Sequence, residues 1–268
     1  PKDLPKARVM TFGYDVDIFS FTSITFSDRL YDYSQSLAYA IVSQRIGCSN
    51  RPILFVAHSL GGLVCQQTLI LSTSIDGLWE ISSSSIGIIF MGTPQYGSSL
   101  ASYREKLARG MKIVHTASRD MVGALHPDSN NAQRVGNEFQ SMLRRGDLAL
   151  NIFCFYEAKN MNGTVGKIVE ENSAVLRGYK NCSIDADHCN MTKFSGHADG
   201  GYGLVRSIIT GWLHESRDCD AANKTAMSAS LSGNPAWLGS WTPGSFCFNG
   251  TANSQGFAYT YGENFAFD

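Results

Sequence analysis

Pro52-Ile-Leu-Phe-Val-Ala-His-Ser-Leu-Gly-Gly62 is the stretch that decides the fold of this 268-residue chain. It is an apolar run of strand length that ends abruptly in small residues around one serine, Ser59, and a helical pattern follows it. A strand, a tight turn that holds a serine and a helix, in this order, are typical of a nucleophile elbow. We therefore expect Ser59 to lie at strained backbone angles above the C-terminal edge of a sheet.

The residues around the serine fit the steric demands of such a turn. Ala57 and Gly61, two positions before and after it, are small enough to approach neighbouring backbone, and Gly62 lets the helix come close to the sheet. We expect the backbone N–H of Leu60 to donate to an oxyanion hole, aided by the positive end of the helix dipole. The alternative is a buried strand, a Gly-rich turn and an incidental serine, because short matches of this kind often arise by chance.

Strand-like and helix-like segments alternate along most of the chain. We expect strands over 7–14, 52–58, 85–91, 148–156 and 182–186, and a short extended piece over 168–176. Helical stripes of apolar residues cover 27–45, 129–143 and 202–214. This alternation predicts an α/β fold with a mostly parallel sheet that helices cover on both faces.

A serine nucleophile needs two partners later in the chain. A serine hydroxyl requires a base within hydrogen-bond reach, and the base requires a carboxylate that orients it and stabilises its cation. Glu157 follows the strand expected over 148–156, and His188 follows the strand expected over 182–186. Both positions lie at the sheet edge where Ser59 is expected, in the order serine, acid, histidine.

Each partner has alternatives. Glu157 could be an ordinary solvated carboxylate, and His188 could be a structural histidine. Asp185 and Asp187 are rival acids that lie too close in sequence to reach the base easily, and His197 is the rival base. No spacing of His, Cys and carboxylates suggests a metal site, and we expect no cofactor.

The composition of the chain limits the classes of partner and the cellular compartments that we expect for it. The net charge of −1 and the lack of basic clusters argue against nucleic acid as a partner. No apolar stretch of the sequence is long enough to span a bilayer. The seven cysteines are odd in number, contain no CxxC pair and lie in part in apolar runs. Reduced cysteines of this kind favour an intracellular, cytoplasmic location.

The composition changes near residue 218. After Lys224 the chain has no Lys or Arg, and Gly, Ser, Asn, Ala and Thr dominate. We therefore divide the chain into a domain over 1–217 and a tail over 218–268 that we expect to lack regular structure. The alternation of Phe257, Tyr259 and Tyr261 leaves a strand in the tail as the alternative.

Four motifs together resemble a known family. They are Ala57-His-Ser-Leu-Gly-Gly62, Gly92-Thr-Pro-Gln-Tyr-Gly-Ser98, Phe155-Tyr-Glu157 and Asp187-His-Cys-Asn-Met-Thr-Lys-Phe194. Over residues 6–215 the chain resembles the lipase-like serine esterases, in particular the branch of serine-active-site-containing proteins with fungal-type members.

The resemblance implies an α/β-hydrolase fold with Ser59 as nucleophile, Glu157 as acid and His188 as base. It also implies a small-molecule or lipid ester as substrate, and fused or partner signalling domains; it leaves contact with a membrane surface open. The alternative function is a weakly catalytic or non-catalytic recognition module of a larger signalling protein.

The chain departs from the family in two places. Gln95 and Tyr96 stand where the family has a histidine and a basic residue, so we expect them, together with His58, to line a changed pocket. The family also has an apolar strand, ending in a His-Gly-Gly-type loop, ahead of the segment that matches 8–14. In the family that strand lies between this segment and the elbow strand, and its loop supplies the second oxyanion N–H. We expect a domain that lacks its N-terminal strands. The alternative is that a tail strand over 257–261 occupies the position between the 8–14 segment and the elbow strand.

Overall fold

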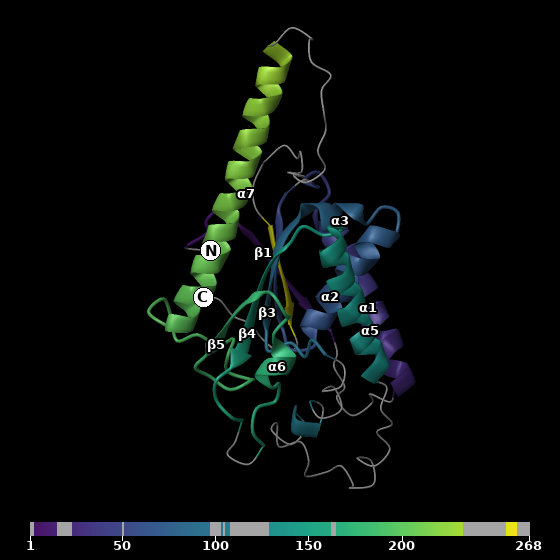
Figure 1. Ribbon diagram of the computed structural model, residues 1–268, viewed down its shortest axis with the longest axis vertical. Coiled ribbons are helices and arrows are strands. Elements are labelled where there is room, and N and C mark those ends of the chain that lie inside the picture. Colours follow the sequence, from purple (N-terminus) through teal and green to yellow (C-terminus); the bar gives the residue numbers. More distant parts are fainter. Residues whose placement is uncertain are drawn as a thin grey trace.

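The structure, a computed structural model, describes residues 3–14, 23–49, 51–96, 103, 105–107, 129–161, 165–232 and 256–261. A central sheet lies between helices (Figure 1). Within these described ranges the sheet has six strands in the order β1-β6-β2-β3-β4-β5, and all neighbouring strands are parallel. The α/β fold class that the alternation predicts is therefore confirmed.

The strands differ in burial according to their place in the sheet. They are β1 (Arg8–Gly13), β2 (Ile53–His58), β3 (Ser85–Met91), β4 (Asn151–Glu157), β5 (Lys180–Ile184) and β6 (Gly256–Tyr261). Strands β2 and β3 lie in the middle and are buried along nearly their whole length. Their unbroken apolar sequences are typical of parallel strands that are covered on both faces. Strand β1, at one edge, alternates between half-buried and exposed residues.

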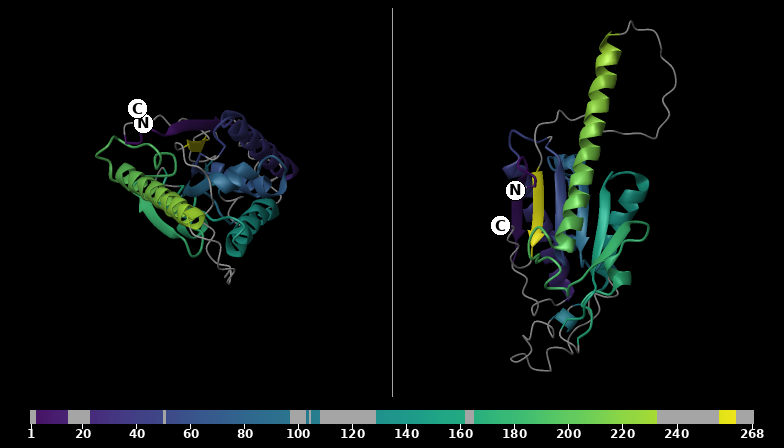
Figure 2. Two further views of the ribbon diagram at one scale, coloured as in Figure 1. Left: turned by 90° about the horizontal axis from the view of Figure 1, so that it is seen from above. Right: turned by 90° about the vertical axis from the view of Figure 1, so that its left-hand side faces the viewer.

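Helices cover both faces of the sheet. They are α1 (Ser23–Gln44), α2 (Gly61–Ser74), α3 (Trp79–Ser84), α5 (Ser129–Arg145), α6 (Glu171–Ala174) and α7 (Gly200–Ser232). Seen from above, α7 lies on one side of the sheet, and α1, α2 and α5 lie on the other (Figure 2). The short helix α6 stands in the segment 168–176, where the sequence suggested an extended piece.

The two faces of the sheet carry two separate hydrophobic cores. Phe55 and Ala57 of β2 belong to the core that includes buried residues of α1, α2 and α5. Leu54 and Val56, which alternate with them along the strand, belong to the core that includes Trp212 of α7. Successive side chains of a strand point to opposite faces, so one apolar run builds both cores.

Strand β6 occupies the position between β1 and β2. Its register pairs Phe257 with Val9 on one side and Ala258 with Phe55 on the other. The expectation that the domain lacks its N-terminal strands stays a prediction, whereas the alternative occupant of this position, a strand over 257–261, is confirmed. The physical reason is the demand for pairing, because each buried backbone group left unsatisfied costs about 1–3 kcal/mol.

The segment 218–268 contributes regular structure to the domain. The expected boundary at 217/218 falls within α7, which runs on to Ser232, and β6 joins the sheet. Residues 233–255 and 262–268 lie outside the described part of the chain. None of the described helices combines the length and the apolar character that crossing a membrane requires.

Candidate active site

Ser59 occupies the turn between β2 and α2. Its φ of 58° is the only positive value of a non-glycine residue among the described residues. Backbone strain of this kind costs roughly 1–3 kcal/mol and persists where the surroundings hold it, often at functional sites. The N–H of Ser59 donates to the carbonyl of Met91 at the end of β3 (2.9 Å). The neighbouring strand thus anchors the strained turn.

The small residues of the turn are all buried. A Cβ on Gly62 would lie 2.1 Å from Oγ1 of Thr93, so no side chain fits there. Thr93 is itself buried and belongs to the loop after β3. Ala57 and Gly61 are also buried. Leu60 stands at the N-cap of α2, where the helix dipole is positive.

His188 lies beside the serine hydroxyl. Its Nε2 is 3.2 Å from Oγ of Ser59, and its side chain is 1 % exposed. Gly92, at φ 60°, makes room for the ring: a Cβ there would lie 3.0 Å from both Cε1 and Nδ1 of His188. Nε2 is therefore the atom placed to accept a proton from the serine.

Glu157 lies on the other side of the imidazole. Its Oε1 is 3.5 Å from Nδ1 of His188, and its side chain is fully buried at the end of β4. The backbone N–H of Val169 donates to the same oxygen (2.6 Å), which fixes the carboxylate. The distance to Nδ1 exceeds that of a standard hydrogen bond, as is frequent in free enzymes before substrate binds. The structure thus places the imidazole of His188 between the hydroxyl of Ser59 and the carboxylate of Glu157.

The rival acids and the rival base lie elsewhere. Asp185 forms an ion pair with Lys159 on the surface (2.9 Å). Oδ1 of Asp187 accepts the backbone N–H of Asn190 (3.0 Å), so this carboxylate caps its own turn. The side chain of His197 is 55 % exposed. The partners of these side chains are therefore groups other than Ser59 and the ring of His188.

Tyr103 is a site residue that the sequence did not reveal. Its hydroxyl is hydrogen-bonded to Oγ of Ser59, and its ring meets the ring of His188 edge to face at 5.8 Å between centroids. The side chain is buried, and burial raises the pKa of its phenol above the ordinary value. Nothing in the residues around position 103 marks this contact, which joins segments 44 residues apart.

The three candidate pocket residues have different surroundings. Nε2–H of His58 donates to the backbone carbonyl of His188 (2.9 Å), so this ring supports the base loop. Gln95 is buried, and its Oε1 accepts a hydrogen bond from the amide of Gln66. The hydroxyl of Tyr96 accepts the backbone N–H of Arg177 (3.4 Å). His58 and Gln95 thus pack inside the protein, behind the surface at which a substrate would arrive.

The buried His58 makes stability depend on pH. Burial, with a smaller effect of the neighbouring His188, lowers the pKa of His58 to about 3. In the unfolded chain the pKa returns to about 6.5. Between these values the unfolded state binds the extra proton, so the stability from neutral His58 is complete above pH 6.5. It is lost as the pH falls, by about 1.4 kcal/mol per pH unit.

We expect His58→Gln to reduce this dependence, because glutamine does not titrate and can still donate to the His188 carbonyl. Between pH 6.5 and pH 5 the wild-type free energy of unfolding should fall by about 2 kcal/mol more than that of the variant. Urea denaturation at the two pH values measures the difference. Equal losses in the two proteins would contradict the buried neutral state of His58.

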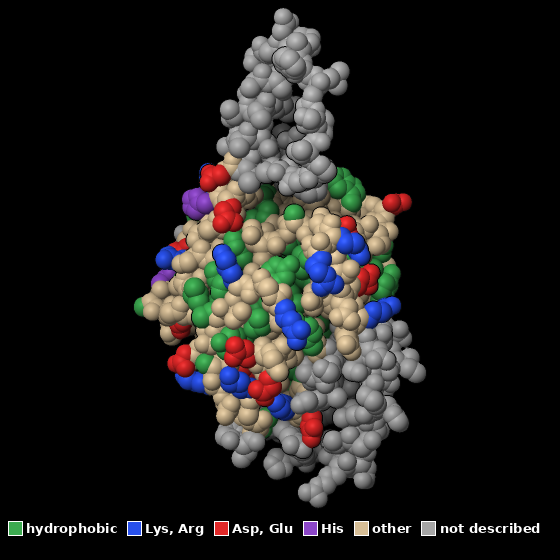
Figure 3. All heavy atoms as spheres, viewed as in Figure 1, with side chains coloured by type: hydrophobic (Ala, Val, Ile, Leu, Met, Phe, Trp, Pro, Cys, Tyr) green, Lys and Arg blue, Asp and Glu red, His purple; other side chains and the backbone are tan. Residues whose placement is uncertain are grey.

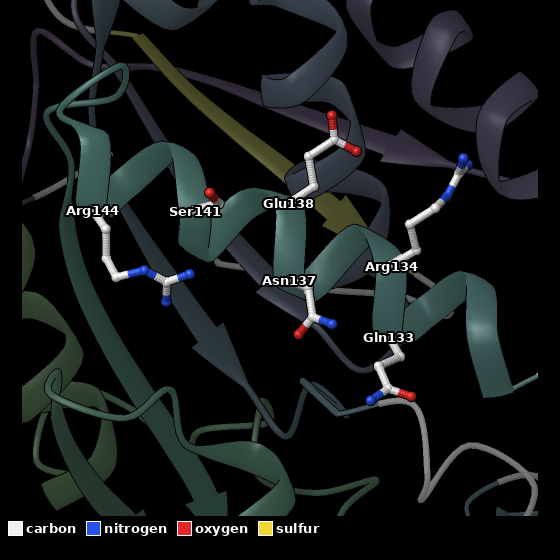
Figure 4. Close-up of a pocket in the computed structure, with 6 residues that line it drawn as sticks. All are labelled: Gln133, Arg134, Asn137, Glu138, Ser141 and Arg144. Atoms are coloured by element: carbon white, nitrogen blue, oxygen red, sulfur yellow. The ribbon is translucent and has the colours of Figure 1, made fainter.

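Charged side chains and a shallow hollow mark the described surface away from Ser59. On the face in Figure 3, acidic and basic side chains are interspersed. A hollow of about 590 Å³ lies on the outer side of α5 (Figure 4) and is lined by Gln133, Arg134, Asn137, Glu138, Ser141 and Arg144. Its lining comes from one helix and includes none of the residues around Ser59. The described residues contain no group of three His, Cys, Asp or Glu that could hold a metal ion.

Comparison with known proteins gives similarity at low identity. No protein-family profile matches the chain. The chain is similar to Protein SERAC1 of Mus musculus, with 28 % identity over 102 residues, 38 % of this chain and 16 % of the relative. It is also similar to Protein SERAC1 of Danio rerio, with 28 % identity over 201 residues, 71 % of this chain and 29 % of the relative.

The chain therefore spans less than a third of the length of these curated relatives. Similarity at this level is a loose link to a hydrolase-like fold, which agrees with the sheet order and the turn at Ser59. The relatives are vertebrate proteins, so the resemblance to fungal-type members stays an expectation.

Proposed function

We propose that this chain is a serine hydrolase that cleaves carboxylic ester bonds through Ser59, His188 and Glu157. The observation that carries the proposal is the contact between Oγ of Ser59, in its strained turn, and Nε2 of His188 (3.2 Å). Three features argue against a structural histidine beside an incidental serine: the strained backbone of the serine, the buried carboxylate behind the ring, and the shared sheet edge.

The residues support the steps of acyl transfer. Nε2 of His188 takes the proton from Oγ of Ser59 while Oγ bonds to the ester carbonyl carbon. The carbonyl oxygen becomes an oxyanion, to which the N–H of Leu60 donates. His188 then passes its proton to the departing alcohol as the tetrahedral intermediate collapses to an acyl-enzyme. A water molecule, activated by the same nitrogen, releases the acid and restores Ser59.

Glu157 stabilises the cation that His188 becomes. Its carboxylate is buried, so its attraction for the imidazolium is less screened than it would be in water. It also fixes the tautomer with the proton on Nδ1, which leaves Nε2 free to accept from the serine.

An ester substrate, small or lipidic, follows from the resemblance to lipase-like esterases alone. Signalling domains, fused or separate, belong to the same proposal. We place the protein in a reducing, intracellular compartment. The absence of a disulfide at the five described cysteines supports this placement: Cys48, Cys65, Cys154, Cys182 and Cys189.

Covalent labelling tests the nucleophile. A fluorophosphonate probe should label the wild-type chain and leave Ser59→Ala unlabelled, since the probe reacts with an activated serine. Ser84→Ala, which removes a serine hydroxyl bonded to the carbonyl of Ser49, is the matched control and should label as the wild type does. Equal labelling of wild type and Ser59→Ala would show that the nucleophile is another residue. An unreactive wild type would favour the recognition module.

A further inference from the structure

The hydroxyl of Tyr103 lies in hydrogen-bond contact with the atom that would attack the substrate. Ser59 is partly exposed at the surface, whereas Tyr103 is 1 % exposed. Its ring meets the ring of His188 edge to face, so both the ring and the hydroxyl of Tyr103 have a partner in the site. A buried tyrosine places its hydroxyl where it has a polar partner. Here that partner is the nucleophile itself.

We propose that Tyr103 is a catalytic residue, whose phenolic O–H donates to the oxyanion of the tetrahedral intermediate together with the N–H of Leu60. The proposal rests on the proposed ester hydrolysis at Ser59 and adds a second oxyanion donor to it.

The hydrogen bonds of the free enzyme are arranged for this role. When Oγ of Ser59 donates to Nε2 of His188, the only role left for Tyr103 is to donate to Oγ. The hydrogen bonds then run from Tyr103 through the serine to the base. The phenol proton already points to the place where the substrate carbonyl will be attacked.

Attack on the carbonyl changes the best acceptor near the phenol. Oγ of Ser59 gives its proton to His188 and becomes the oxygen of an ester-like bond, a weaker acceptor than the oxyanion that forms on the same carbon. Two oxygens on one carbon lie close together, so a small rotation about the phenolic C–O bond redirects the proton from one to the other. Tyr103 keeps its proton throughout, and no bond to it forms or breaks.

A phenol donates only while it is protonated. Burial is the main cause that raises the pKa of Tyr103, and the hydrogen bond with Ser59 opposes it less strongly. Tyr103 therefore stays neutral at every pH at which an esterase would be assayed. A buried donor that needs only this small rotation is close to the preorganised arrangement that stabilises an oxyanion best.

Tyr103→Phe tests the proposal, because it removes the hydroxyl and keeps the ring. With p-nitrophenyl butyrate as substrate, kcat should fall roughly 10²- to 10³-fold with little change in KM, the usual loss for one oxyanion donor. The thiono analogue of the same ester develops charge on sulfur, a poor hydrogen-bond acceptor. Its kcat should fall much less, so the preference for the oxygen ester should shrink.

Two variants keep the outcomes distinct. Tyr202→Phe, which removes a phenol that donates to Asp3, should leave both rates unchanged. Tyr103→Phe with rates equal to or above wild type, or with equal losses on both esters, would overturn the role of Tyr103. If Ser59→Ala is inactive in those cases, the proposed hydrolysis stands without it. If Ser59→Ala keeps the wild-type rate, the proposed function and this inference both fail.

Discussion

Replacing His188 by glutamine should lower kcat for ester hydrolysis by roughly 10⁶-fold, the loss expected when a serine hydrolase has no base. Glutamine fills much of the same space, but its amide does not accept a proton from Ser59 near neutral pH. KM should change little, because the base acts on the serine and contributes little to substrate binding. Steady-state kinetics with p-nitrophenyl butyrate measures both constants.

His197→Gln is the control for this substitution. It replaces the second histidine that the sequence offers as a base, on a loop where that side chain is 55 % exposed. This variant should hydrolyse the ester at the wild-type rate. A large loss in His197→Gln together with a mild loss in His188→Gln would show that His197, and not His188, is the base.

Glu157→Gln should lower kcat by about 10⁴-fold, as loss of the carboxylate does in the serine protease triad. Oε1 of Glu157 both accepts the N–H of Val169 and faces Nδ1 of His188, so one atom of the amide must serve both neighbours. If the amide oxygen takes this place, the contact with Val169 is kept, but the negative charge that stabilises the His188 cation is lost. If the amide nitrogen takes it, the bond with Val169 is lost and the ring proton is forced onto Nε2, which then cannot accept the proton of Ser59.

Asp185→Asn is the matched control, because Asp185 is the carboxylate of a neighbouring strand end that pairs with Lys159 on the surface. Exposed ion pairs contribute about 0–1 kcal/mol, so neither the rate nor the melting temperature should change much. A comparable loss of rate in the two variants would contradict the assignment of Glu157. Thermal unfolding followed by circular dichroism separates a loss of chemistry from a loss of fold.

The elbow could be predicted because its signals are local. An apolar run, a serine among small residues and a helical pattern stand next to one another around Ser59. Glu157 and His188 could be placed because each follows an expected strand, and parallel strands bring their C-terminal ends to one sheet edge. The distance between these residues needs the full fold, since 31 positions along the chain separate them.

Tyr103 could not be predicted for the opposite reason. Its contact with Ser59 is purely tertiary, and the residues around the tyrosine give no sign of it. Gln95 also shows that a local motif does not predict how a side chain packs in the folded protein. Its place in a motif suggested a pocket, and only the packing against Gln66 reveals that the side chain is buried.

The place of β6 also sets an order of events during synthesis. Strands β1 and β2 leave the ribosome early, yet the strand that pairs with both of them ends only at Tyr261. At about 5–20 residues per second, the roughly 200 residues between β2 and β6 take roughly 10–40 s to make. Throughout that time the facing edges of β1 and β2 are open to other chains. Closure of the sheet therefore waits for the end of synthesis and is among the last events of folding.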